Sequence, residues 1–243
     1  MSPIVRVVVG AVVLLAITGV ALTLAGVRAH RAVAIAALRA AAQLTLVALA
    51  LRGVFAAPLA VVAVIAVMFS VVVWTAWGRL RGHADALRSV AVSCGAGAAV
   101  AIGVIVGLPV LTRDVRTLVA VSGIVLGGTM TAATLTGRRI ADGLRLRRPE
   151  VEAWLSLGAT PRQAVRDIAR GAVFEALVPA LDQTRTVGLV SLPGAFVGAL
   201  LGGVSAATAA RFQIVVLVGL LCAEAITATI LAHLIGAPAV LPD

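Results

Sequence analysis

Long apolar runs, separated by short stretches that carry arginine, dominate the pattern of the chain. A helix needs roughly 20 consecutive apolar residues to cross a bilayer core of about 30 Å. Seven runs approach or reach this length and are predicted to span a membrane: 7–27, 32–51, 53–78, 89–112, 117–137, 186–204 and 212–236. The pattern therefore predicts an all-α fold, a polytopic helical bundle embedded in a membrane.

The segment 138–185 is the longest polar stretch, yet its apolar residues recur at helical spacing. Pro149 and the acids that follow it suit the first turn of a short helix. Gly158 suits the end of that helix, and Thr160 followed by Pro161 suits the start of the next. We therefore expect a helical hairpin within this segment.

Composition agrees with a membrane location, since 61% of the residues are hydrophobic and 12% are charged, whereas about a quarter are charged in soluble domains. Positively charged loops stay on the cytoplasmic side of a membrane. Nine of the 20 arginines lie in 138–185, which places this segment inside the cell. We expect one membrane domain over residues 1–243 in the inner (cytoplasmic) membrane, with the N-terminus outside and the C-terminus inside.

The net charge of +10 does not indicate a nucleic-acid partner, because the arginines lie between or beside the apolar runs. All 20 basic residues are arginine, so the chain has no lysine for a Walker A loop or a Schiff base. His30, His83 and His233 are scattered, which argues against an intramembrane enzyme. If ATP drives this protein, a separate polypeptide must bind the ATP.

The hairpin resembles the coupling motif of ABC transporter permeases, which carries an EAA triplet, then a glycine, then an isoleucine at fixed spacing. Glu152, Ala153, Gly158 and Ile168 occupy those positions. Trp154 replaces the second alanine, and the Leu-Pro pair expected after the isoleucine is absent. The resemblance implies that a separate ABC ATPase, using ATP and magnesium, docks on this hairpin.

The residues expected to couple the chain to an ATPase are Glu152, Ala153, Leu155, Leu157, Gly158, Ala159, Thr160, Pro161 and Ile168. Leu155 and Leu157 would provide an apolar plug. An alternative is that the hairpin is an amphipathic helix on the inner leaflet, with its arginines against anionic headgroups.

A longer stretch, Pro179–Ala195 with its continuation to Ile214, resembles the FetB-type permease family of bacteria. Arg39–Leu44 and Ser122–Met130 support the resemblance. It implies a permease homodimer that exports iron or another metal ion and holds no cofactor of its own. The alternatives are an ABC permease for a non-metal substrate such as a nucleotide sugar, and a carrier or channel that needs no ATPase.

Arg39 lies within a predicted span, where a guanidinium costs at least about 2.5 to 3.5 kcal/mol unless it is paired or hydrated. Gln43 lies one turn further on the same face, and Glu224 is a mid-span acid in the last run. We hypothesise an ion pair between Arg39 and Glu224, with either a structural or a gating role.

Asp182 is expected at the cytoplasmic mouth of the sixth span, either in an interfacial ion pair with Arg185 or as an entry site for a cation. Ser191 and Pro193 interrupt that span, and the proline frees a backbone carbonyl for a side chain, water or substrate. Metal ligands stay unknown, because no dense spacing of ligand residues is present.

Overall fold

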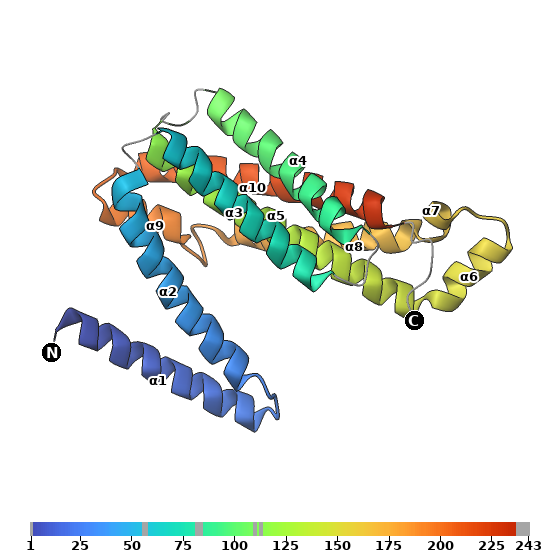
Figure 1. Ribbon diagram of the computed structural model, residues 1–243, viewed down its shortest axis with the longest axis horizontal. Coiled ribbons are helices and arrows are strands. Elements are labelled where there is room, and N and C mark those ends of the chain that lie inside the picture. Colours follow the sequence, from blue (N-terminus) through green and yellow to red (C-terminus); the bar gives the residue numbers. More distant parts are fainter. Residues whose placement is uncertain (1, 55–57, 81–84, 109–110, 112–113, 237–243) are drawn as a thin grey trace. The chain divides into compact units, whose positions relative to one another are not determined.

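The computed structural model describes residues 2–54, 58–80, 85–108, 111 and 114–236, in which it forms ten helices (Figure 1). They belong to two compact units, Met1–Ala57 and Pro58–Asp243. The first unit contains α1 (Pro3–Leu24) and α2 (His30–Val54). The second contains α3 (Pro58–Arg79), α4 (Ala86–Gly107), α5 (Val115–Leu146), α6 (Arg148–Ser156), α7 (Pro161–Ala164), α8 (Arg166–Thr186), α9 (Gly194–Leu201) and α10 (Ala206–Ile235).

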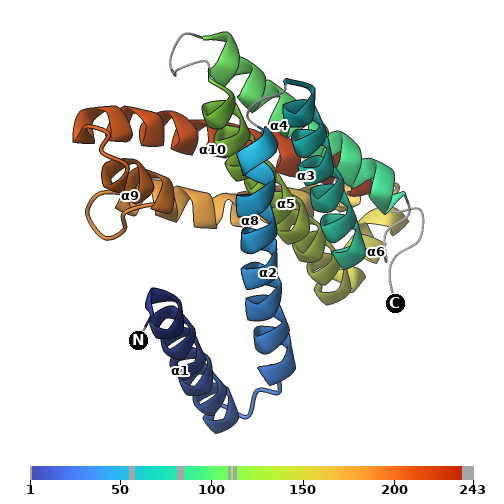
Figure 2. The same cartoon turned by 60° about the vertical axis from the view of Figure 1, so that its left-hand side comes forward.

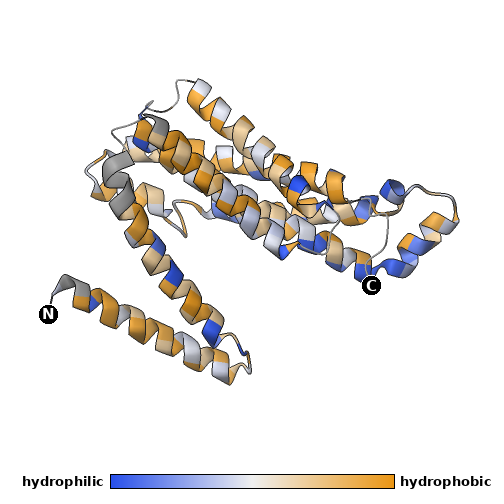
Figure 3. Ribbon diagram, viewed as in Figure 1, coloured by the Kyte–Doolittle hydropathy of each residue, from blue (hydrophilic) through white to orange (hydrophobic). Residues whose placement is uncertain are grey.

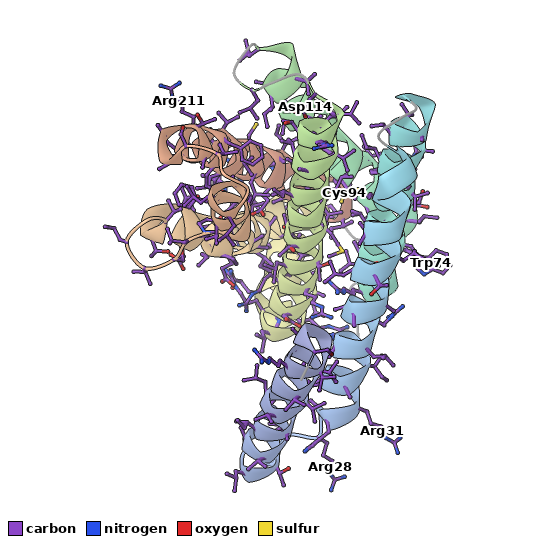
Figure 4. All side chains as sticks on the ribbon, turned by 90° about the vertical axis from the view of Figure 1, so that its left-hand side faces the viewer. Arg28, Arg31, Trp74, Cys94, Asp114 and Arg211 are labelled. Atoms are coloured by element: carbon purple, nitrogen blue, oxygen red, sulfur yellow. The ribbon has the colours of Figure 1, made fainter. Side chains whose placement is uncertain are left out.

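The first unit is a helical hairpin with a tight turn. Gly26 takes a left-handed conformation (φ 69°) just after α1, and Thr23 and His30 are hydrogen-bonded across the turn (Oγ1 to Nε2, 2.9 Å). Arg28 and Arg31 lie at this turn and project outwards (Figure 4). None of the residues 5–48 is buried, and most are apolar, as expected for helices whose surface meets lipid.

In the second unit, α5 is the central helix and contacts α3, α4, α8 and α10 (Figure 2). Val90, Val125, Ile140 and Leu231 are fully buried where these helices meet. Cys94 of α4 lies inside this core, whereas Trp74 of α3 projects outwards (Figure 4). The unit is thus built from apolar helix faces packed on one another, with apolar residues also on its surface.

Six of the predicted spans correspond to helices that are long and apolar enough to cross a membrane: α1, α2, α3, α4, α5 and α10. The run 186–204, which was predicted as an interrupted span, does not contain a helix of membrane length. There α8 ends at Thr186, and the eight-residue α9 begins only at Gly194. A helix of eight residues is about 12 Å long, which is too short for the bilayer core.

The hairpin predicted within 138–185 is present, but it is formed by α6 and α7 alone. The first residues of that segment continue α5 to Leu146. After the hairpin, α8 runs back along α5 and α10, burying Ile168, Ala172, Ala176 and Ala180. Residues four apart lie on one face of a helix, and this face of α8 packs into the bundle.

Candidate functional site

The hairpin begins with a short helix that is held in shape by ion pairs along its surface. Pro149 and Glu150 lie in the first turn of α6. Arg147 pairs with Glu150 (2.6 Å), and Arg148 pairs with Glu152 (2.8 Å). The Arg147 guanidinium lowers the pKa of the Glu150 carboxyl. Such pairs at helical spacing support a short helix.

The hairpin turns where the sequence predicts. Gly158 is left-handed (φ 87°), and the backbone N–H of Ala159 donates to the carbonyl of Trp154 (3.0 Å), which closes α6. The Thr160 hydroxyl accepts from the backbone N–H of Gln163, whose side chain accepts from the backbone N–H of Thr160 (2.8 Å). With Pro161 in the first turn of α7, this capping box makes a defined second arm.

Apolar residues alternate with hydrophilic ones along this hairpin (Figure 3). Trp154, Leu155 and Leu157 are 51%, 36% and 81% exposed. Val151, by contrast, is fully buried and anchors α6 to the bundle. Exposed apolar side chains of this kind are typical of a surface that meets a protein partner or a membrane.

Ile168 has a different position from the rest of the predicted coupling residues. It is buried in α8 and packs against Gly143 of α5, where a Cβ atom would overlap its side chain. Ile168 therefore joins the beginning of α8 to α5 and does not belong to the exposed face of the hairpin.

The interruption predicted at Ser191 and Pro193 is confirmed. Between α8 and α9, the carbonyl of Thr186 accepts from the backbone N–H of Val190 (2.9 Å), and Gly188 donates to the carbonyl of Ser191 (2.9 Å). Gly188 is left-handed (φ 83°), and Pro193 precedes α9. The loop exposes Leu189, Val190 and Leu192, an apolar surface that suits a membrane or a protein partner.

Asp182 lies within a helix and not at its beginning. It is sixteen residues into α8, about 24 Å from the hairpin end of that helix. Its side chain is exposed, and among the described residues no ion pair joins it to Arg185, so the interfacial ion pair is not present. The expected place of Asp182 at the cytoplasmic mouth, and its role as an entry site for a cation, stay predictions.

Glu224 is buried at the centre of the second unit, where it is 5% exposed. It faces Gly128 of α5, where a Cβ atom would lie 2.7 Å from Glu224 Oε1. One turn further along α10, the Thr227 hydroxyl donates to the carbonyl of Ser93 in α4 (3.2 Å). Gly128 was not predicted as a site residue. The sequence feature that could have indicated it is the Gly127-Gly128 pair, because small residues allow helices to approach closely.

The carboxylate of Glu224 takes part in no hydrogen bond or ion pair recorded for the described residues. Burying an uncompensated carboxylate costs several kcal/mol. The position therefore needs a cation or a proton to neutralise it, which is the chemistry expected along a cation pathway.

Arg39 and Gln43 are exposed, one turn apart, on α2 of the first unit. Glu224 belongs to the second unit. The ion pair between Arg39 and Glu224 stays a prediction.

In the described part of the chain, no group of three or more His, Cys, Asp or Glu residues is close enough to hold a metal ion. Cys94 is buried, and its thiol donates to the carbonyl of Thr129 (3.6 Å). Cys222 is a free, exposed cysteine, and His83 lies outside the described residues. The metal ligands stay unknown.

The sequence matches a family model described as "Uncharacterised protein family (UPF0014)" over residues 5–238. It is 34% identical over 198 residues to the UPF0014 membrane protein STAR2 of Oryza sativa subsp. japonica, covering 81% of this chain and 70% of that protein. It is 31% identical over 202 residues to the "Probable iron export permease protein FetB" of Escherichia coli K12, covering 81% and 76%. No solved structure matches the chain.

The match extends over nearly all of the chain, including the hairpin, the interrupted segment and Glu224. The six long apolar helices agree with the description of the relatives as membrane proteins. The chain is therefore a multi-pass membrane protein that belongs to the UPF0014 family.

Proposed function

We propose that this chain is the membrane-spanning permease subunit of an ABC transporter that exports iron or another metal ion. A separate ATPase subunit binds hairpin α6–α7 and supplies the energy. The observation that carries the proposal is the hairpin itself, with Trp154, Leu155 and Leu157 exposed on a capped, ion-paired frame. The E. coli relative named as a probable iron export permease supports the cargo.

The hairpin is joined to the long helices α5 and α8 in a way that suits the transmission of movement into the bundle. Only Arg147 separates α5 from α6, and only Val165 separates α7 from α8. Val165 is fully buried, as is Val151. A displacement of the hairpin by an ATPase therefore acts on both α5 and α8. Because α5 carries Gly128 opposite Glu224, the same displacement changes the surroundings of the buried carboxylate.

The arrangement of α8 and α9 also supports the proposed orientation, with the N-terminus outside and the C-terminus inside. From the hairpin, α8 runs back along the bundle, and α9 follows it before α10 returns. In the proposed topology α8 and α9 together make the crossing that the sequence assigned to 186–204. Interrupted helices of this kind form transport sites in other membrane transporters.

We further propose that two copies of the permease form a homodimer. Asp182, Gln183 and Arg185 are exposed near the end of α8, at a depth in the bundle where polar side chains are costly in contact with lipid. A second copy, or a water-filled path between two copies, would cover this polar surface.

Co-purification with the cognate ABC ATPase, sought first among neighbouring genes, tests the docking proposal. The wild-type permease is expected to retain the ATPase. Leu157→Ser removes a side chain whose burial is worth about 1.5 to 3 kcal/mol, so the retained ATPase should fall about tenfold or more.

Leu146→Ser is the matched control, because Leu146 is 83% exposed at the base of the hairpin, against 81% for Leu157 at its tip. It should retain the ATPase. If no ABC ATPase binds, or if both variants bind as the wild type does, this hairpin is not the docking element.

A further inference from the structure

A groove of about 400 Å³ lies in the second unit where α7 and the beginning of α8 meet the end of α10. Its lining combines small and apolar residues with basic ones. The lining residues are Arg162, Arg166, Ala169, Arg170, Val173, Thr229, Ala232, His233 and Gly236. Among the residues that the structure describes, none that lines the groove is acidic.

The arginines of the groove have no acidic partner in the described structure. Arg162, Arg166 and Arg170 are exposed, follow one another at four-residue spacing, and take part in none of the ion pairs recorded there. Arg166 and Arg170 lie four residues apart on α8, where like charges repel one another. Of the acids nearest in sequence, Glu175 pairs with Arg139 (2.7 Å), and Asp167 takes part in none of the ion pairs recorded for the described residues.

Three guanidinium groups and an imidazole around one concavity match an anion that accepts several hydrogen bonds. Arginine binds phosphate with two parallel hydrogen bonds, and it keeps its charge at every physiological pH. His233 reaches the same groove from the last turn of α10. The chemistry of the lining thus favours a phosphate group over a carboxylate, which offers fewer acceptor oxygens.

The surface beyond the groove indicates which phosphate compound fits. On the same face of α8, Arg170 is followed at four-residue spacing by Phe174 and Val178, which are 63% and 36% exposed. A basic pocket that continues into an exposed apolar stripe matches a molecule with an anionic head and an apolar tail. Basic pockets on the cytoplasmic side of membrane proteins bind anionic lipid headgroups in this way.

We propose that the groove formed by Arg162, Arg166, Arg170 and His233 binds the phosphate of an anionic phospholipid, whose acyl chain lies along Phe174 and Val178. The bound lipid bridges α7, α8 and α10 at the point where the hairpin joins the bundle. This site needs neither an ATPase nor a transported substrate, so its test is independent of the proposed function.

Native mass spectrometry of the purified full chain in mild detergent tests the site with phosphatidylglycerol as the probe. Phosphatidylcholine, inorganic phosphate and ATP are the comparison ligands. Arg166→Gln with Arg170→Gln should weaken phosphatidylglycerol binding about tenfold or more, because two charged contacts are lost. Arg138→Gln with Arg145→Gln is the matched control, since it removes two exposed arginines outside the groove, and it should bind as the wild type does.

Unchanged phosphatidylglycerol binding in the groove variant would overturn the proposal, as would equal losses in both variants. Equally strong binding of inorganic phosphate or ATP, lost in the same groove variant, would assign the groove to free phosphate compounds and overturn the lipid proposal. The thermal unfolding midpoint checks that each variant is folded. Should the double variant not fold, Arg170→Lys replaces it, because it keeps the charge but loses the planar fork.

Discussion

At the level of single residues, the close approach of Glu224 to Gly128 bears most directly on the proposed transport. The carboxylate is buried against a glycine that leaves it just enough room. Its neighbours hold the helix in place, since Thr227 is hydrogen-bonded to the backbone of α4. The structure thus places a group that needs neutralising inside a tightly packed part of the bundle.

Glu224→Gln keeps the size of the side chain and removes its charge. If a cation meets this carboxylate during transport, the variant should fold and reach the membrane normally but transport the metal at least about tenfold more slowly. Radioactive iron export from cells, corrected for the amount of permease, measures the change. Wild-type export by this variant would show that the carboxylate is a structural feature only.

Gly128→Ala should destabilise the bundle by about 1 to 3 kcal/mol, because the added methyl group overlaps Leu220 and lies against Glu224. Gly127→Ala is an unusually close control, since the adjacent position has nothing within 4 Å and alanine favours a helix. The thermal unfolding midpoint should fall for the first variant and stay level or rise for the second. Equal midpoints would contradict the close packing of α5 on α10.

At the scale of the element, the hairpin depends on a few backbone positions. Gly158→Ala places a side chain on a left-handed residue, which costs about 1 to 2 kcal/mol. The distorted hairpin should stimulate the ATPase less, while permease stability changes little. Gly171→Ala in α8 is the control, because its surroundings are open and its φ is not left-handed. Equal stimulation of the ATPase by both variants would contradict a role for the hairpin geometry.

The first turn of α5 offers a prediction about stability and pH. Asp114 caps α5 by accepting from the backbone N–H of Thr117 (2.5 Å), and this hydrogen bond holds the pKa of the carboxyl below its ordinary value of 3.8. A lowered pKa in the folded state means that the stabilisation is present above the unfolded pKa and is lost as the pH falls through the folded one.

Asp114→Ala should therefore lower the free energy of unfolding by about 0.5 to 2 kcal/mol near neutral pH. The difference from the wild type should shrink below about pH 4. Asp114→Asn, which can still cap the helix, should lose less. Unfolding in detergent at several pH values measures this, and a pH-independent loss in the alanine variant would contradict the capping role.

The elements that the sequence predicts well are those with local signals. Pro149, Gly158 and Thr160 each mark a helix boundary by their own chemistry, and the hairpin follows them. For the run 186–204, Pro193 marks the interruption by its own chemistry, whereas hydropathy averages over the run and does not show that only an eight-residue helix forms there. Close approaches between helices depend on tertiary packing, which the sequence pattern does not show. The pattern therefore does not tell that Gly128 is packed against α10 while Gly127 is not.

At the scale of the whole molecule, the second unit connects three features that a driven exporter requires. The hairpin offers a docking surface, α5 and α8 lead from it into the bundle, and Glu224 lies where α5 meets α10. The first unit contributes two helices in which none of the residues 5–48 is buried, which suits a position in lipid. The proposed lipid groove lies at the joint between the hairpin and the bundle.

Reconstitution of the permease with its ATPase in proteoliposomes tests the central claim most directly. With the ATPase on the outer surface, export corresponds to iron entering the lumen. The account predicts that ferrous iron accumulates only when ATP and magnesium are added, and that Leu157→Ser abolishes the ATP-dependent part while Leu146→Ser does not. Iron entry at the same rate without ATP, or ATP hydrolysis that moves no metal ion, would contradict it.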